Sequence, residues 1–150
     1  MITESAVSSD PIIINAPVEV VWDIIVDFKN YGLWNQFCPE AEADLTLGSP
    51  IKMKVDLGNG LQDQLEYISR IEPHVAIAWA MENKPGDPIH AERTQKLERI
   101  DANSCRYVSI DEFSGPAVND MMQAMAKPVE AGFNLCARCL KDYAERVHAG

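Results

Sequence analysis

The side chains best suited to chemistry lie on two consecutive predicted strands, residues 89–100 and 104–113, joined by a turn at 101–103. Because side chains alternate between the two faces of a strand, this strand pair can be read in two phases. In the first phase, one face carries a guanidinium, an amide, a hydroxyl and a carboxyl, those of Arg93, Gln95, Ser109 and Asp111. In the second phase, that face carries His90 and Glu92. The alternation alone leaves both phases open.

Each phase implies a different acid and base. Arg93 and Asp111 on neighbouring strands can neutralise one another, which would let both be buried as a purely structural pair. The same pair could orient an enolate or a carboxylate, with Asp111 as the base. In the second phase, His90 and Glu92 become the acid and base candidates. Tyr67 could offer its hydroxyl to a carbonyl group of a ligand, and the alternative is a tyrosine that only packs in the core.

The longest predicted element is a helix over residues 117–147. Apolar residues recur there at steps of three and four, which places them on one stripe. Pro128 removes a backbone hydrogen bond and clashes with the carbonyl group four residues earlier, so we expect a kink or a break. Gly132 leaves the backbone bare beside Phe133, which suits the close approach of a neighbour or a ligand.

A helix of this length is not stable alone, so its apolar stripe must lie on another element. Before the strand pair, apolar and polar residues alternate with a period of two. This pattern predicts further strands at 43–47, 51–57, 61–71 and 75–81. Ile68 interrupts its alternation, which indicates a bulge. The order predicts an α+β fold, with a curved antiparallel sheet of about six or seven strands wrapped around the C-terminal helix. One helix cannot fill the whole concave face, so we expect an internal cavity between them.

The N-terminal part is predicted to hold a strand and short helices. Residues 1–10 are interpreted as a loose lead and residues 11–15 as the first strand. Asn15 is the candidate N-cap of a helix that starts at Pro17. The connection at 33–39 is rich in aromatic residues, which we expect to tuck inward because they are costly to leave in water.

Composition narrows the function. The 150 residues suffice for a single domain with a real core, and the net charge of −10 argues against nucleic acid or an anionic membrane as a partner. No run approaches the ~18 apolar residues of a membrane-spanning helix. Residues 1–10 have neither the basic residues nor the apolar run of a secretory signal, so a cytoplasmic location is expected.

The sequence predicts neither a metal nor a cofactor. Cys136 and Cys139 are three apart on the predicted helix, where a disulfide is unfavourable, and Cys38 and Cys105 are isolated. We expect all four cysteines to be small buried side chains in a reducing compartment. The chain has no glycine-rich phosphate loop and no nucleophile elbow, which disfavours nucleotide-dependent and hydrolase-triad chemistry.

Short segments distributed over residues 11–147 form a recognisable succession. They are Ile14-Asn15-Ala16-Pro17, Val21-Trp22, Asp27-Phe28-Lys29-Asn30-Tyr31, Trp34-Asn35-Gln36-Phe37, Gly48, Glu72-Pro73, Ile77-Ala78-Trp79, Glu112-Phe113-Ser114-Gly115, Gly132-Phe133 and residues 140–145. In this succession the chain resembles the START-like (SRPBCC) superfamily, whose fold is the helix-grip fold, and specifically its polyketide cyclase/dehydrase-like branch. Gln36 stands where that family has a proline. The matches are fold-level positions, so the resemblance implies the fold more strongly than the chemistry.

The resemblance favours the first phase of the strand pair and places the site in the internal cavity. The catalytic candidates are then Asp111, Arg93 and Tyr67. The predicted ligand-binding residues are Trp34, Phe37, Met53, Trp79, Gln95, Ser109, Met121, Met125, Val129 and Phe133.

Three functions are compatible with this interpretation. The first is a carrier or sensor that binds a hydrophobic small molecule in the cavity, and a homodimer is compatible with it. The alternative is a cofactor-independent cyclase/dehydratase or lyase that acts on a polyketide-like or aromatic substrate. A third, a protein-interaction role like that of heat-shock co-chaperones of the superfamily, would need an exposed apolar patch on the convex face. A base with a displaced pKa in the cavity would favour turnover, whereas paired or absent charges would favour carriage.

Overall fold

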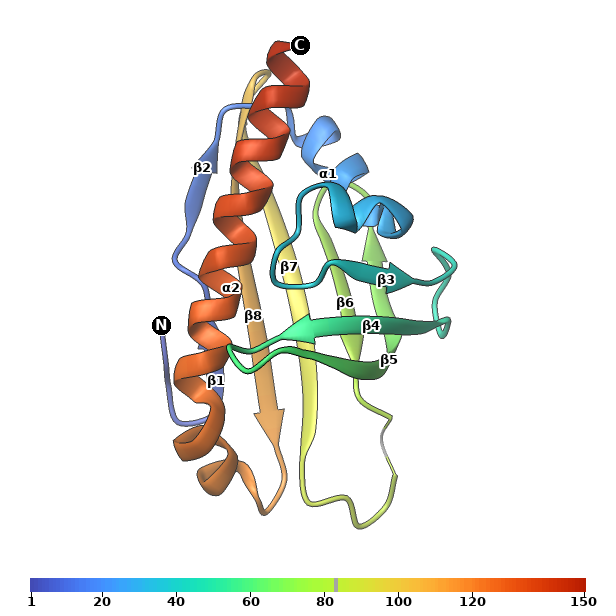
Figure 1. Ribbon diagram of the computed structural model, residues 1–150, viewed down its shortest axis with the longest axis vertical. Helices are drawn as coiled ribbons and strands as arrows, with labels where there is room; N and C mark the ends of the chain where they lie inside the picture. The colour runs from blue at the N-terminus through green and yellow to red at the C-terminus, as the bar shows by residue number, and fades with distance from the viewer. Residues whose placement is uncertain (83) are drawn as a thin grey trace.

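The computed structural model, which describes residues 1–82 and 84–150, consists of one antiparallel sheet and one long helix with short helices at its side (Figure 1). The helices are α1 (Val18–Val26), the 3-10 helix η1 (Phe28–Leu33) and α2 (Val118–Ala149). The strands are β1 (Ala6–Ser8), β2 (Ile12–Ile14), β3 (Glu40–Glu42), β4 (Pro50–Asp56), β5 (Leu61–Glu72), β6 (Ala76–Ala80), β7 (His90–Asp101) and β8 (Ser104–Ser114). The predicted α+β helix-grip fold is confirmed.

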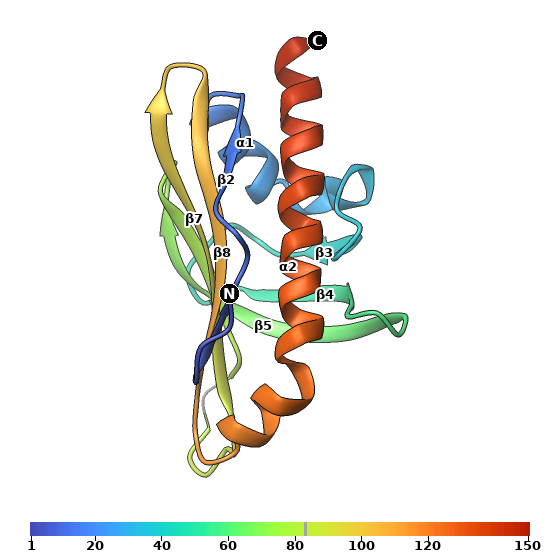
Figure 2. The ribbon, with the colours of Figure 1, turned by 90° about the vertical axis from the view of Figure 1, so that its left-hand side faces the viewer.

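All described strands belong to one sheet of eight, in the order β1-β8-β7-β6-β5-β4-β3, with β2 also paired to β8. The strands β7 and β8 run alongside α2 (Figures 1 and 2), whereas β4 and β5 run crosswise to it and pass behind it in the view of Figure 2. The sheet therefore curves around the helix. The residues of α2 that are buried recur at steps of three and four, as the sequence predicts: Ala126, Val129, Gly132, Phe133, Cys136, Ala137, Leu140 and Ala144.

Two irregular residues shape α2. Pro128 does not break the helix, which continues through it. The first turns of α2 are angled away from the rest (Figure 2), as expected for a kink upstream of a proline. At Gly132, an added Cβ would lie 2.4 Å from Cε1 and 2.6 Å from Cδ1 of Phe37. The close neighbour expected at Gly132 is therefore the Phe37 ring, which lies against bare helix backbone.

The N-terminal residues correct one expectation. Residues 1–10 are not a loose lead, because β1 pairs with β8, with Ala6 opposite Glu112, and Val7 is fully buried. Three residues are too few for a period-two pattern to stand out, which explains why the sequence did not reveal β1.

The first predicted strand is β2, but the expected cap of the following helix is absent. Asn15 donates its backbone N–H to the Glu145 carboxylate at 2.9 Å, which ties β2 to the last turns of α2. The helix α1 begins after Pro17, and no side chain caps its N-terminus. The prediction of Asn15 as an N-cap was wrong.

The strands around the cavity follow the predicted pattern with one exception. In β4, buried and exposed residues alternate, and a register shift between Ile68 and Arg70 confirms the bulge in β5. The predicted strand at 43–47 was wrong: the strand is β3, which ends at Glu42, and no strand is assigned to the residues from there to β4. The buried residues of β4 are Ile51, Met53 and Val55.

Two further findings concern the whole described chain. Within residues 1–82 and 84–150, no helix has the length and the apolar character that crossing a membrane requires. The four cysteines are free, and Cys38, Cys105 and Cys136 are buried as expected, whereas Cys139 is only partly buried.

Candidate functional site

The register of β7 and β8 decides between the two phases. Arg93 lies opposite Asp111 and Gln95 lies opposite Ser109, and the Arg93, Gln95 and Ser109 side chains are buried. The first phase is confirmed. Glu92 lies on the outer face of the sheet, where its carboxylate accepts a hydrogen bond from the Ser69 hydroxyl at 2.7 Å.

Arg93 is held by aromatic rings rather than by a carboxylate. Its guanidinium carbon lies 4.4 Å from the ring centroid of Phe133, 5.4 Å from that of Phe37 and 5.7 Å from that of Trp79. Its Nε donates to the Ser109 hydroxyl at 2.8 Å, and an Nη lies 3.8 Å from the Cys136 sulfur. The electron-rich faces of aromatic rings stabilise a cation, so they compensate part of the lost hydration.

Arg93 and Asp111 do not neutralise one another by direct contact. Although the structure describes both side chains, the ion pairs it contains do not include them. The Oδ1 atom of Asp111 is buried and has no hydrogen-bond partner among the described residues. The expected Arg–Asp pair was therefore wrong in its geometry, because strand register fixes where two residues lie but not where their side chains point.

An interior cavity of about 60 Å³ lies between the sheet and the N-terminal half of α2. Its lining consists of Phe37, Met53, Val55, Leu57, Gln64, Glu66, Trp79, Arg93, Asp111, Val129 and Phe133. A volume of this size holds about two water molecules, and ligand sites usually enclose about 300 to 1,000 Å³. The cavity is in the predicted place but much smaller than expected, because the aromatic rings around Arg93 fill the rest.

Glu66, on β5, is the site residue that the sequence did not reveal. Burial raises the pKa of the Glu66 carboxyl to about 7; the Asp111 carboxylate adds to this, and Arg93 opposes it. Burial likewise raises the pKa of Asp111 to about 6, again against the effect of Arg93. Two carboxyl groups thus titrate near neutral pH in one cavity, which is the kind of perturbation found at functional sites.

The bulge in β5 contained a signal that Glu66 faces the cavity. Ile68 is buried and pairs with Trp79, and because side chains alternate, Glu66 shares its face. The phase of β5 has to be read from Ile68 rather than from Leu65. Tyr67 pairs with Ala80 and consequently points to the outer face, so the prediction that its hydroxyl reaches the cavity was wrong.

The predicted site residues divide into three groups. The cavity is lined by Phe37, Met53, Trp79, Arg93, Asp111, Val129 and Phe133. Two others lie deeper in the core, where Ser109 holds Arg93 and Gln95 accepts a 2.6 Å hydrogen bond from the Tyr107 hydroxyl. The third group neither lines the cavity nor takes part in these two hydrogen bonds, and it consists of Tyr67, Trp34, Met121 and Met125.

Trp34 belongs to a separate aromatic cluster. Its ring stacks on Tyr143 of α2, with centroids 6.3 Å apart, and meets Tyr31 edge to face at 5.2 Å. It is buried as predicted, but it fixes the C-terminal half of α2 to η1 instead of contacting the cavity.

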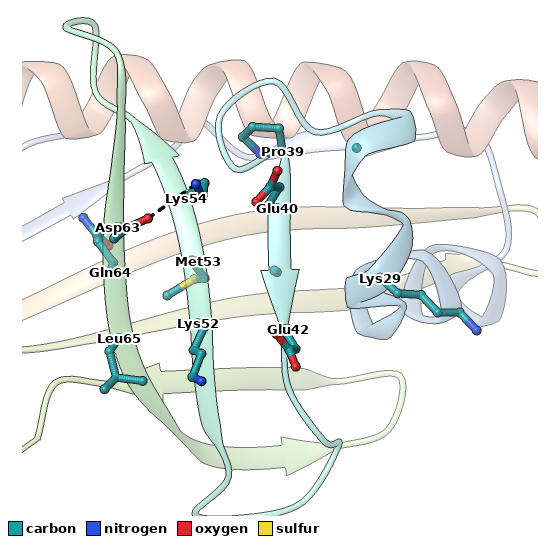
Figure 3. A pocket seen from close by; sticks show the side chains of 12 residues that line it. Lys29, Pro39, Glu40, Glu42, Lys52, Met53, Lys54, Asp63, Gln64 and Leu65 are labelled. Atoms are coloured by element: carbon teal, nitrogen blue, oxygen red, sulfur yellow. Dashed lines mark ion pairs between the residues drawn. The ribbon is translucent and has the colours of Figure 1, made fainter.

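A larger hollow, of about 880 Å³, lies outside the core along η1, β3, β4 and β5 (Figure 3). Its charged side chains are of both signs, and Lys54 pairs with Asp63 at 3.9 Å. Lys52 and Lys54 are exposed to solvent. Exposed, mutually compensated charges do not define a site, so the smaller interior cavity is the better candidate. In the described part of the chain, no group of three or more His, Cys, Asp and Glu residues is placed to hold a metal ion.

Comparison with known proteins identifies the family. The family model described as "Activator of Hsp90 ATPase homolog 1-like protein" matches residues 15–145. The chain belongs to this family. The match covers both the cavity and the aromatic cluster, and it confirms the START-like resemblance. No curated protein matches the chain significantly.

Solved structures with the same fold include members of this superfamily. The Zhui aromatase/cyclase from Streptomyces sp. R1128 is 17% identical, with a TM-score of 0.73 over 94% of this chain and 93% of that one. A START superfamily protein from Mycobacterium smegmatis is 15% identical, with a TM-score of 0.67 over 95% and 99%. The di-domain aromatase/cyclase StfQ of the steffimycin pathway is 11% identical, with a TM-score of 0.71 over 98% and 53%. At these identities the likeness shows the fold alone.

Proposed function

We propose that the protein binds a small molecule in the interior cavity between α2 and the sheet. The observation that carries this proposal is the buried Oδ1 of Asp111, which has no hydrogen-bond partner among residues 1–82 and 84–150 and belongs to a side chain that lines the cavity. An unpaired buried carboxylate oxygen costs stability, and a purely structural core gains nothing from it. A bound molecule that supplies the partner would account for it.

The cavity has to enlarge to hold more than two water molecules. Three of the lining residues, Leu57, Glu66 and Asp111, are only partly buried. The cavity therefore reaches solvent at the end that these three residues form. Met53 lines the same cavity, and methionine adapts its shape more readily than other apolar residues. We infer that a ligand enters here and displaces Met53 and Leu57, while Arg93 and its aromatic rings remain fixed.

The relatives support the proposal at the level of the fold. Two of the similar structures are described as aromatase/cyclases and one as a START superfamily protein. The mostly apolar lining agrees with the expected hydrophobic ligand, and the carboxyl groups of Glu66 and Asp111 add a polar end to it. The cytoplasmic location and the homodimer stay predictions.

Native mass spectrometry of the protein purified from its own host tests the proposal. We expect a retained small molecule in the native protein. Val129→Phe, which fills the cavity, should abolish retention while the unfolding temperature stays near that of the native protein. Val147→Phe, at an exposed position on the far part of α2, is the matched control and should retain the ligand. Equal retention by both folded variants, or by neither the native protein nor the control, would contradict the proposal.

Catalysis by proton transfer is the second candidate, and the raised pKa values of Glu66 and Asp111 favour it. A carboxylate that titrates near neutral pH can serve as a general base in a cyclase- or dehydratase-like reaction. Exchange of the α-protons of phenylacetone in heavy water, followed by NMR, tests this directly. The native protein should accelerate exchange and Asp111→Asn should not. Binding of the ketone without acceleration would leave the protein as a carrier.

A further inference from the structure

We propose that the ligand of the interior cavity carries a protonated amine, which the carboxylates of Glu66 and Asp111 hold at the partly open end. This inference rests on the proposed function and specifies the chemical class of the ligand. Three observations support it: the orientation of the Arg93 guanidinium, the unpaired Oδ1 of Asp111, and the charges of the side chains that line the cavity.

The Arg93 guanidinium is the cation that lines the cavity, and it already contacts other groups of the protein. The Arg93 guanidinium lies among the rings of Phe133, Phe37 and Trp79, and its Nε donates to Ser109. It reaches neither carboxylate as an ion pair within the described chain. A bound anion could use only the N–H groups that Ser109 and Cys136 leave free, and it would lie beside the negative charges of Glu66 and Asp111 in the same cavity. Arg93 is therefore poorly placed to recognise a carboxylate ligand.

The groups without a partner are acceptors. Asp111 presents a buried Oδ1 without a partner among the described residues, and the Glu66 carboxyl lines the same cavity. An ammonium group has three N–H donors and a positive charge, so it can satisfy two carboxylates at once. A hydroxyl group has one donor and no charge and would leave one carboxylate unpaired.

The charges that face the cavity support a cation. Glu66 from β5, Asp111 from β8 and Arg93 from β7 are its titratable lining residues; β4 and α2 contribute only apolar ones, and the Cys136 thiol of α2 lies behind Arg93. With both carboxylates ionised the net charge is −1. An ammonium ion brings it to zero, as a proton does in the empty cavity. The apolar part of the ligand would then lie against Met53, Leu57 and Val129.

Isothermal titration calorimetry with three probes of one shape tests the inference: benzylamine, benzyl alcohol and benzoate. Benzylamine should bind about tenfold or more tightly than either other probe at about pH 8, where both carboxyl groups are ionised. Its affinity should fall by about tenfold at about pH 5, where both are protonated although the amine keeps its charge. Glu66→Gln and Asp111→Asn should each remove most of this preference. Glu112→Gln, next to Asp111 but on the outer face, is the matched control and should keep it.

The outcomes separate this inference from the proposed function. If benzyl alcohol or benzoate binds as well as benzylamine, and Val129→Phe abolishes that binding, the cavity is a site but its amine preference is refuted. Preference for benzylamine that survives both Glu66→Gln and Asp111→Asn refutes the inference as well. If no probe binds at either pH while the protein from its own host retains a small molecule, the inference fails and the proposed function stands; if nothing is retained either, both fail.

Discussion

Arg93 and Asp111 are direct cross-strand neighbours on β7 and β8, yet the guanidinium turns away from the carboxylate into three aromatic rings. The consequence is a core with a satisfied cation and an unsatisfied acid. Ser109 and the rings keep the cation in place, and the Asp111 Oδ1 is left facing a small void. This separation of the two charges underlies both proposals above.

Replacing Arg93 by lysine should lower the free energy of unfolding by about 1 to 3 kcal/mol. An ammonium group cannot lie flat on the rings as a guanidinium does, and it cannot keep the Nε–H bond to Ser109, so the buried charge loses that hydrogen bond and part of its contact with the rings. Urea unfolding followed by circular dichroism measures the change. Arg106→Lys, on the outer face of β8, is the control and should stay within about 0.5 kcal/mol of the native protein. Equal effects of the two changes would show that the rings do not hold Arg93.

Gly132→Ala should destabilise the protein by about 1 to 3 kcal/mol, although alanine is the better helix former by about 1 kcal/mol. The new Cβ would overlap the buried Phe37 ring. Ala131→Gly at the neighbouring exposed position serves as the comparison and should cost about 1 kcal/mol through helix propensity alone. In the double variant Gly132→Ala with Phe37→Leu, the loss should be smaller than the sum of the single losses. Additive losses would argue against this contact.

The contribution of Glu66 to stability should fall as the pH rises from about 4 to about 8. The pKa of this carboxyl is about 7 in the folded state, above the unfolded value of about 4.3, so the folded state holds the proton more tightly. The contribution is fully present below the unfolded pKa and is lost as the pH passes through 7. Glu66→Gln should reduce the difference in unfolding free energy between the two pH values by on the order of 2 kcal/mol.

Glu72→Gln on the same strand should have the opposite sign. The hydrogen bond from Arg70 holds the pKa of Glu72 below its usual range, so its contribution is present at high pH and is lost on acidification. Removing it should lower stability at about pH 8 and not at about pH 3. For Glu66, the contradicting result is an unfolding free energy that depends on pH in the same way in the native protein and in Glu66→Gln. That result would show that the Glu66 carboxyl is not desolvated.

The thiols should react in two classes. Burial raises the pKa of Cys38 to about 12 and that of Cys105 to about 11, and it also raises the pKa of Cys136. Only Cys139 is partly exposed. In the folded protein, Ellman's reagent at about pH 8 should therefore label one thiol, which Cys139→Ser removes, and the other three should react only after unfolding. Rapid labelling of a second thiol in the folded protein would contradict the buried placement.

The sequence predicted most of the elements and about half of the site. In the 32 residues of α2, apolar residues recur many times at steps of three and four, and in β4 apolar and polar residues alternate. Both elements could therefore be predicted from the sequence. Glu66 was missed because the bulge after Ile68 changes which face of β5 its neighbours share. The orientation of the Arg93 side chain could not be predicted from the sequence either, because it depends on aromatic rings from three separate segments that meet only in the folded chain. The size of the cavity depends on that same packing.

Binding in the interior cavity can be observed by methyl NMR of the six methionines during titration with benzylamine and benzyl alcohol. Met53 lines the cavity, whereas Met1 is largely exposed at the N-terminus. We expect a saturable shift of the Met53 methyl signal with at least one probe, no shift at Met1, and loss of the Met53 shift in Val129→Phe. A folded protein whose Met53 signal stays unchanged with both probes would contradict binding in this cavity.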